Sequence, residues 1–192
     1  MTIGIAVFDG AEELDFVGPW EVLRMWELSF GGPHVHLVAP TLGPFTCAKG
    51  MRVLADHSWA TAPPLSVLVY AGGRGTRPQL DDLVVQGWLT DLAAAGALMT
   101  SVCTGSLVFA AAGLLAGRPA TTHWASLAEL ALLDETIDIR PEDRFVDDGN
   151  IVTAAGVSAG IDMALHLVRR LSDDDTASQV RRAIQYDPEP PV

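Results

Sequence analysis

Cys103 is the residue whose surroundings most strongly indicate chemistry. Small and apolar residues lead into it, and Gly105 follows two positions later. This pattern predicts a strand that turns sharply into a helix, with the intervening side chain on a strained elbow. The elbow would place the sulfur at a helix N-terminus, whose partial positive charge favours the thiolate. We therefore expect a reactive nucleophile, and a buried, inert cysteine is the alternative.

Asp15 is the carboxyl group that would serve this cysteine. It follows the first predicted strand, four residues before Pro19. If the first and fourth predicted strands are neighbours in a parallel sheet, their carboxyl-end loops bring Asp15 to Cys103. A carboxyl group beside a thiol acts as a general acid or base. An N-cap of the helix predicted to begin at Phe16 explains the same residue equally well.

Two glycines and a histidine complete the candidate site. The backbone N–H groups of Gly72 and Gly73 would stabilise a developing negative charge, although a tight turn also explains both residues. His123 would approach the cysteine as a base, but a structural histidine is the more common case. The glycine-rich run 72–77 matches neither a dinucleotide-binding fingerprint nor a P-loop, so we expect no nucleotide cofactor.

The elements that must position these residues alternate between apolar strands and helices. Such alternation predicts an α/β fold, a flavodoxin-like three-layer sandwich with a mostly parallel central sheet and helices on both faces. Functional sites of such sheets lie at the carboxyl ends of the strands. Strands are predicted at 2–8, 34–39, 65–70 and 97–102, and hairpins at 44–58 and 144–154. Helices are predicted at 16–28, 78–95, 105–115 and 160–171, with short helices from 126 and 172.

Two helices carry finer predictions. In the helix at 78–95, five apolar residues would share the buried face: Leu80, Leu83, Val84, Trp88 and Leu92. The tetrapeptide 126–129 is a capping-box signature, in which the first and last side chains bond to backbone N–H groups of the helix start.

Composition limits the classes of partner. A chain of 192 residues predicts one domain, here residues 1–186, followed by a frayed tail at 187–192. A net charge of −12 argues against nucleic acid and anionic membranes. No apolar run is long enough to span a membrane, and the N-terminus lacks the basic region of a signal peptide. Two cysteines form no disulfide framework, so we expect a cytoplasmic protein. His34 and His36 have no third ligand nearby, so we expect no metal site.

Seven segments, spread over nearly the whole chain, resemble the ThiJ/PfpI superfamily, which has the class I glutamine-amidotransferase-like fold. They are Ile5–Gly10, Glu13–Pro19, Ala71–Gly73, Ser101–Gly105, Gly113–Leu115, Thr121–Trp124 and Ser158–Asp162. Within the superfamily, the Cys-Thr-Gly elbow and the aspartate after the first strand resemble isocyanide (isonitrile) hydratases. They also resemble the ligand-binding half of AraC-type regulators.

The resemblance implies roles for individual residues. Cys103 would be the nucleophile, Asp15 would hydrogen-bond to it and handle protons, and Thr104 would follow the nucleophile. The backbone N–H groups of Gly73 and Thr104 would form an oxyanion-hole-like site. The resemblance also implies a homodimer.

Two departures argue against other members of the superfamily. Proteases and many glyoxalase-like members carry a histidine directly after the nucleophile, where this chain has Thr104. Amidotransferases use a late His-x-Glu pair, whereas His166 is followed by Leu167 and Val168. The run 73–78 is also more polar than an apolar isocyanide requires.

Three functional hypotheses follow. The first is a cysteine-dependent isocyanide hydratase, which forms an N-substituted formamide through a covalent thioimidate and needs no cofactor. The second is a non-catalytic module that binds a small molecule or senses oxidants through Cys103. The third is a glyoxalase or deglycase that acts on reactive carbonyl compounds.

Overall fold

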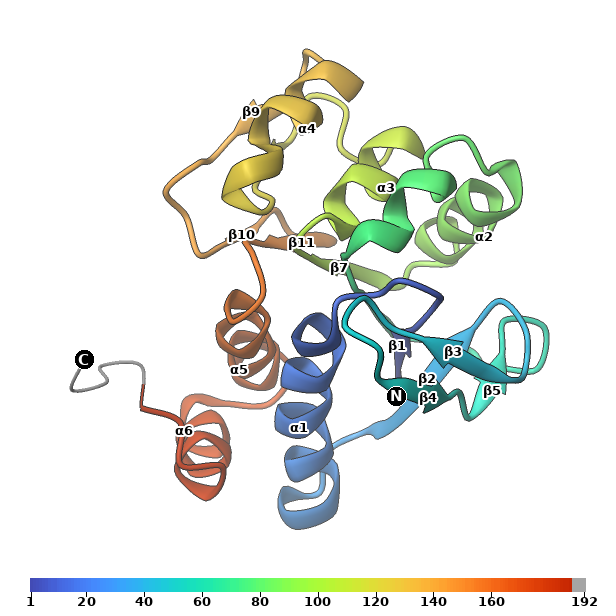
Figure 1. The fold of residues 1–192 in the computed structure, drawn as a ribbon. Helices are drawn as coiled ribbons and strands as arrows, with labels where there is room; N and C mark the ends of the chain where they lie inside the picture. The colour runs from blue at the N-terminus through green and yellow to red at the C-terminus, as the bar shows by residue number, and fades with distance from the viewer. Residues whose placement is uncertain (188–192) are drawn as a thin grey trace.

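The computed structural model describes residues 1–187, and within them the main sheet has seven strands (Figure 1). Its order is β10-β11-β7-β6-β1-β2-β5, and every neighbouring pair is parallel except β10 with β11. The strands are β1 (Thr2–Ala6), β2 (His34–Ala39), β5 (His57–Ser58), β6 (Val67–Tyr70), β7 (Leu98–Val102), β10 (Phe145–Asp147) and β11 (Ile151–Ala154). This architecture confirms the predicted mostly parallel α/β fold.

Helices cover both faces of the sheet. The α-helices are α1 (Glu13–Phe30), α2 (Leu83–Ala94), α3 (Gly105–Ala111), α4 (Leu127–Leu133), α5 (Ala159–Leu171) and α6 (Asp174–Ala183). Figure 1 shows α1, α5 and α6 together on one side and α2 and α3 on the other, with α4 beside α3. Short 3-10 turns are η1 (Arg74–Gln79) and η2 (Trp124–Ser126).

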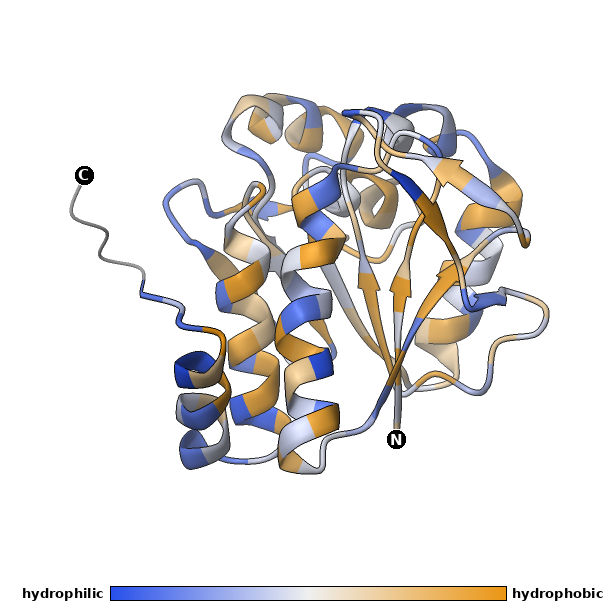
Figure 2. Ribbon diagram, turned by 60° about the horizontal axis from the view of Figure 1, so that its bottom comes forward, coloured by the Kyte–Doolittle hydropathy of each residue, from blue (hydrophilic) through white to orange (hydrophobic). Residues whose placement is uncertain are grey.

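The central strands are buried on both faces. Figure 2 shows hydrophobic strands enclosed by helices whose polar residues face outward. Strands β6 and β7 contain no exposed residue, which is the burial expected for a covered parallel sheet. Both predicted hairpins are present, but the first is shorter than predicted, because His57 and Ser58 form β5 of the main sheet. One is the ribbon of β3 (Pro44–Thr46) and β4 (Arg52–Leu54), and the other is the antiparallel edge formed by β10 and β11. A further small ribbon pairs β8 (Pro119–Ala120) with β9 (Asp138–Ile139).

Helix α1 begins three residues earlier than the sequence predicts. Its N-cap is Glu12, so Asp15 lies inside the first turn and the N-cap interpretation of Asp15 is wrong. The predicted adjacency of the first and fourth strands is also wrong, because β6 lies between β1 and β7. The carboxyl ends of all three strands nevertheless meet at one edge of the sheet, as parallel pairing requires.

The helix predicted at 78–95 is divided into η1 and a shorter α2. Asp82 ends the connection between them, because its side chain accepts hydrogen bonds from the N–H groups of Val84 and Val85. The buried face therefore begins at Val85 and Leu89, and the side chains of Leu83 and Val84 are exposed. The prediction that these two residues are buried is wrong.

The capping box at 126–129 is not formed. Helix α4 does begin after Ser126, but the Ser126 hydroxyl caps no backbone N–H group. Both side chains of the predicted box instead contact Arg77 of η1. Of the predicted tail, only Asp187 lies within the described residues.

Candidate active site

Cys103 lies on the strained elbow that the sequence predicts. It follows β7 directly, precedes α3 by one residue, and has a φ of +55°, which a non-glycine residue rarely adopts. Its N–H group lies 3.1 Å from the carbonyl oxygen of Ala154 and 3.0 Å from that of Ala155. Its carbonyl oxygen accepts hydrogen bonds from the hydroxyls of Ser106 and Thr122. These bonds hold the strained conformation in place.

Asp15 is completely buried next to this elbow. Its Oδ2 accepts a 2.9 Å hydrogen bond from the N–H group of Gly72, and its carboxyl group interacts with the Cys103 thiol. A Cβ atom at Gly72 would lie 2.8 Å from both Asp15 Oδ2 and Cys103 Cβ. The missing side chain at Gly72 therefore allows the carboxyl group and the cysteine to come together.

Burial controls the protonation of this pair. Desolvation raises the pKa of Asp15 to about 7, against the opposing effects of the hydrogen bond from the Gly72 N–H and of the nearby Cys103 thiol. Desolvation and the negative charge of Asp15 raise the pKa of Cys103 to about 12. The sulfur therefore carries its proton at neutral pH. These two effects oppose the expected resting thiolate, because burial and the adjacent carboxylate both raise the pKa of the thiol.

Val157 is a site residue that the sequence analysis missed. It lies between β11 and α5 with a φ of +52°. Its N–H group interacts with both Asp15 and Cys103 and favours their ionised forms. The contact uses only the backbone, so the residue type gives no signal. Only the pairing of β11 with β7 places this loop beside the elbow.

The two glycine N–H groups already have hydrogen-bond partners within the site. The N–H of Gly72 donates to Asp15, and the N–H of Gly73 donates to Thr104 Oγ1 at 2.9 Å. Both bonds help to build the site, and the charge-stabilising role of these N–H groups stays a prediction. The N–H groups of Thr104 and Val157 are the ones that favour a negative sulfur.

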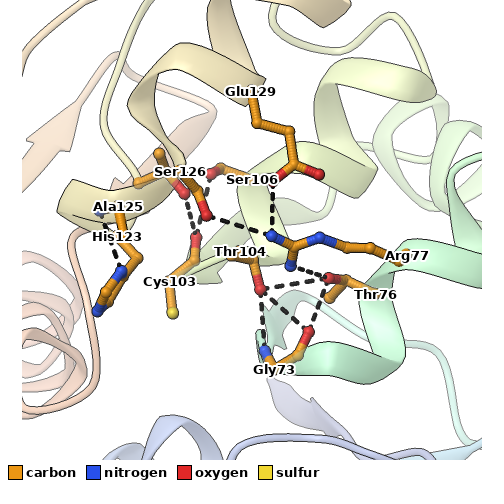
Figure 3. Close-up of polar contacts among 11 residues, drawn as sticks. Gly73, Thr76, Arg77, Cys103, Thr104, Ser106, His123, Ala125, Ser126 and Glu129 are labelled. Carbon is orange, nitrogen blue, oxygen red and sulfur yellow. Dashed lines mark hydrogen bonds and ion pairs between the residues drawn. The ribbon is translucent and has the colours of Figure 1, made fainter.

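The Thr104 hydroxyl faces η1 and not the sulfur (Figure 3). It lies 3.2 Å from both the Gly73 carbonyl oxygen and the Thr76 hydroxyl, in addition to the bond from the Gly73 N–H. Thr76 is itself completely buried. The Thr104 side chain therefore fixes η1 against the elbow.

His123 and Arg77 lie on opposite sides of Cys103 in Figure 3. The Nδ1 atom of His123 accepts a hydrogen bond from the N–H of Ala125, and its ring packs against Gly156. Both side chains line a cleft of about 350 Å³ that contains the cysteine. The residues of this cleft are Glu12, Gly73, Arg74, Arg77, Cys103, Thr104, His123, Ser126 and Val157.

The cleft thus brings Cys103, Thr104, Gly73 and His123 together, with Asp15 and Gly72 packed directly behind them. In residues 1–187, no three His, Cys, Asp or Glu side chains converge to hold a metal ion. No helix in this part of the chain is long and apolar enough to cross a membrane.

Comparisons with known proteins identify similar chains. The sequence profile of the DJ-1/PfpI family matches residues 1–170. An isonitrile hydratase of Pseudomonas putida is 40% identical over 191 residues, which covers 100% of this chain and 81% of that protein. The transcriptional regulator CdhR of Pseudomonas aeruginosa is 31% identical over 145 residues, covering 76% of this chain and 43% of the regulator. A crystal structure of a ThiJ/PfpI family protein from Pseudomonas syringae has a TM-score of 0.88 and 34% identity, covering 100% of this chain and 77% of that one.

Proposed function

Because the chain belongs to the DJ-1/PfpI family, we propose that it is a cysteine-dependent isocyanide hydratase, which converts an isocyanide into an N-substituted formamide. The observation that carries this proposal is the buried pair of Asp15 and Cys103 beside a small cleft. The identity of 40% to an isonitrile hydratase supports the class of substrate.

The first half of the reaction forms a covalent intermediate. The Asp15 carboxylate accepts the thiol proton while the Cys103 sulfur bonds to the terminal carbon of the isocyanide. Asp15 then gives this proton to the same carbon, which produces a thioimidate. A pKa of about 7 suits Asp15 for both transfers, because acid and base forms coexist near neutral pH.

The second half consumes one water molecule. Asp15 accepts a proton from the water as the water oxygen bonds to the thioimidate carbon. Asp15 then passes that proton to the thioimidate nitrogen. The carbon–sulfur bond then breaks, its electron pair returns to sulfur, and the hydroxyl proton passes to sulfur. The products are the formamide and the original Cys103 thiol.

Backbone donors lower the barrier to the first step. The N–H groups of Thr104 and Val157 favour negative charge on the Cys103 sulfur, which develops as the proton leaves. They are fixed by the elbow and by the β11–α5 connection, so they need no reorganisation during the reaction.

Formamide production by purified variants tests the proposal. We expect Cys103→Ala to abolish turnover, and Asp15→Asn to lower kcat by about a hundredfold or more while circular dichroism reports a folded protein. Cys47→Ser is the matched control, because Cys47 is also a buried free cysteine but does not line the cleft. Hydration of an isocyanide by Cys103→Ala at the wild-type rate would remove the hypothesis.

The two alternative functions have distinct signatures. An oxidant sensor requires an accessible thiolate, whereas Cys103 is 6% exposed and has a raised pKa. Many carbonyl-modifying members of the superfamily carry a histidine directly after the nucleophile, where this chain has Thr104. Oxidation of Cys103 by peroxide without any turnover would favour the sensor. Formation of lactate from methylglyoxal would favour the carbonyl-modifying enzyme.

We also propose a cytoplasmic homodimer, as the resemblance implies. Light scattering coupled to size-exclusion chromatography tests the assembly, and twice the mass of the chain is the expected result. A mass equal to one chain would exclude the dimer.

A further inference from the structure

We propose that the Cys103 cleft selects small isocyanides that carry a carboxylate, and that Arg74 and Arg77 bind this group. The inference rests on the proposed isocyanide chemistry and adds the class of substrate. Both arginines belong to η1 and line the same cleft as the cysteine. Arginine is suited to this role because its planar fork matches a carboxylate.

The segment that carries the arginines is held rigidly. The Thr76 hydroxyl contacts Gly73 and Thr104, which links η1 to the cysteine elbow. The N–H of Gly75 donates to the Gly10 carbonyl oxygen, and a Cβ atom at Gly75 would lie 2.0 Å from the carbonyl oxygen of Asp9. The two arginines therefore project from a fixed support between two strand ends, as a preorganised binding site requires.

Arg77 is positioned by three neighbouring side chains (Figure 3). Its guanidinium group donates to Thr76, Ser126 and Glu129 at 3.1, 3.2 and 2.6 Å. A guanidinium group has five N–H donors, so two remain without a partner among the described residues. Ser126 and Glu129 are the two residues of the capping box that the sequence predicts. In the structure they position Arg77 instead.

Arg74 supplies an uncompensated charge. Its side chain is exposed and forms no hydrogen bond or ion pair with any residue in 1–187 that the structure records. The acidic group that lines the cleft, Glu12, is paired with Lys49, and Arg77 is paired with Glu129. Among the side chains that line the cleft, Arg74 thus keeps one uncompensated positive charge, in a chain whose net charge is −12.

The size of the cleft limits the ligand. Its volume of about 350 Å³ lies at the lower end of the range for small-molecule sites. Cys103 requires the isocyanide carbon at the base of the cleft, so the anionic group of the substrate would extend toward η1. A short isocyano-carboxylate satisfies both requirements.

A pair of substrates with equal shape and different charge tests the inference. Isocyanopropanoate and isocyanopropanamide have the same number of heavy atoms, and only the first is an anion. We expect wild-type kcat/KM to favour the carboxylate by about tenfold or more. Arg74→Gln should remove most of this preference through a higher KM for the carboxylate, and Arg74→Lys should restore part of it.

A control variant of equal net charge separates the possible outcomes. Arg182→Gln changes the net charge equally but alters an exposed residue of α6 outside the cleft, so its preference should equal that of wild type. Turnover of both substrates with no carboxylate preference, or an unchanged preference in Arg74→Gln, overturns this inference and leaves the proposed function intact.

Absence of turnover for both substrates contradicts the proposed function instead. Calorimetric binding of the two compounds to Cys103→Ser then decides the present inference by itself. Tighter binding of the carboxylate that is lost in the Cys103→Ser, Arg74→Gln double variant supports the arginine site. Equal binding of the acid and the amide refutes it.

Discussion

Asp15→Asn should make the protein more stable than wild type at high pH, although it removes a proposed catalytic group. Asn retains an oxygen that accepts the hydrogen bond from the Gly72 N–H, and it removes the charge that burial opposes. The unfolded chain has Asp15 near its ordinary pKa of 3.8, and the folded protein has it at about 7. Between these values the folded state holds more protons than the unfolded state, so wild-type stability falls as pH rises.

The magnitude follows from the size of the shift. A rise in pKa from 3.8 to about 7, at about 1.4 kcal/mol per pKa unit, corresponds to about 4 kcal/mol. Asp15 is completely buried, so solvent does not screen this effect. The free energy of unfolding of Asp15→Asn, relative to wild type, should therefore increase by about 4 kcal/mol from pH 4 to pH 8.

Urea denaturation of both proteins at several pH values measures this difference. Asp147→Asn is the matched control, because the pKa of Asp147 is shifted in the opposite direction. Partial burial of Asp147 would raise its pKa, but hydrogen bonds from His166 and Gly149 and the charge of Arg170 lower it overall. The free energy of unfolding of wild type should therefore exceed that of Asp147→Asn most at neutral pH, and the difference should shrink as pH falls. If the difference in unfolding free energy between Asp15→Asn and wild type stays constant from pH 4 to pH 8, the raised pKa of Asp15 and the proton-transfer role derived from it are refuted.

Three further predictions concern the elbow. Asp15→Asn should shift the pH midpoint of iodoacetamide alkylation of Cys103 downward in a Cys47→Ser background, because the carboxylate raises the thiol pKa; an upward shift would contradict this. Gly72→Ala should lower the free energy of unfolding by about 3 kcal/mol and abolish turnover, because its Cβ would lie 2.5 Å from the Thr104 nitrogen. Gly87→Ala in α2 is the control, because no described residue lies close to the added Cβ; thermal denaturation should show that it stabilises the protein by about 1 kcal/mol. Thr104→Val should cost about 1–3 kcal/mol by leaving the Gly73 N–H unpaired, and Thr104→Ser should recover most of it; equal losses in both variants would contradict the hydroxyl's role.

The elbow connects the fold to the proposed chemistry. The strained φ of Cys103 directs its side chain away from the path of β7 and α3 and toward the carboxyl end of the sheet. Hydrogen bonds to both backbone groups of Cys103 hold this conformation, and Asp15 reaches it from the first turn of α1. The pair of Asp15 and Cys103 is therefore built by two strand ends that are not adjacent, with the Gly72 backbone between them.

The amino-acid sequence by itself determined the fold class and the elbow, and it pointed to the two residues of the proposed catalytic pair. Alternating apolar strands and helices allow few arrangements other than a covered parallel sheet, and the small residues around Cys103 permit a sharp turn from strand to helix. These features depend on local spacing and backbone sterics, which a sequence expresses directly.

Tertiary structure alone decided the protonation of the site and the partners of its polar groups. The pKa values of Asp15 and Cys103 depend on burial, which results from packing of α1 against the sheet and not from either residue's neighbours in sequence. The roles of Val157, the Gly73 N–H and Arg77 likewise depend on contacts between segments far apart in the chain. Hydrogen bonds and desolvation are set by distances in space, and a one-dimensional pattern does not contain those distances.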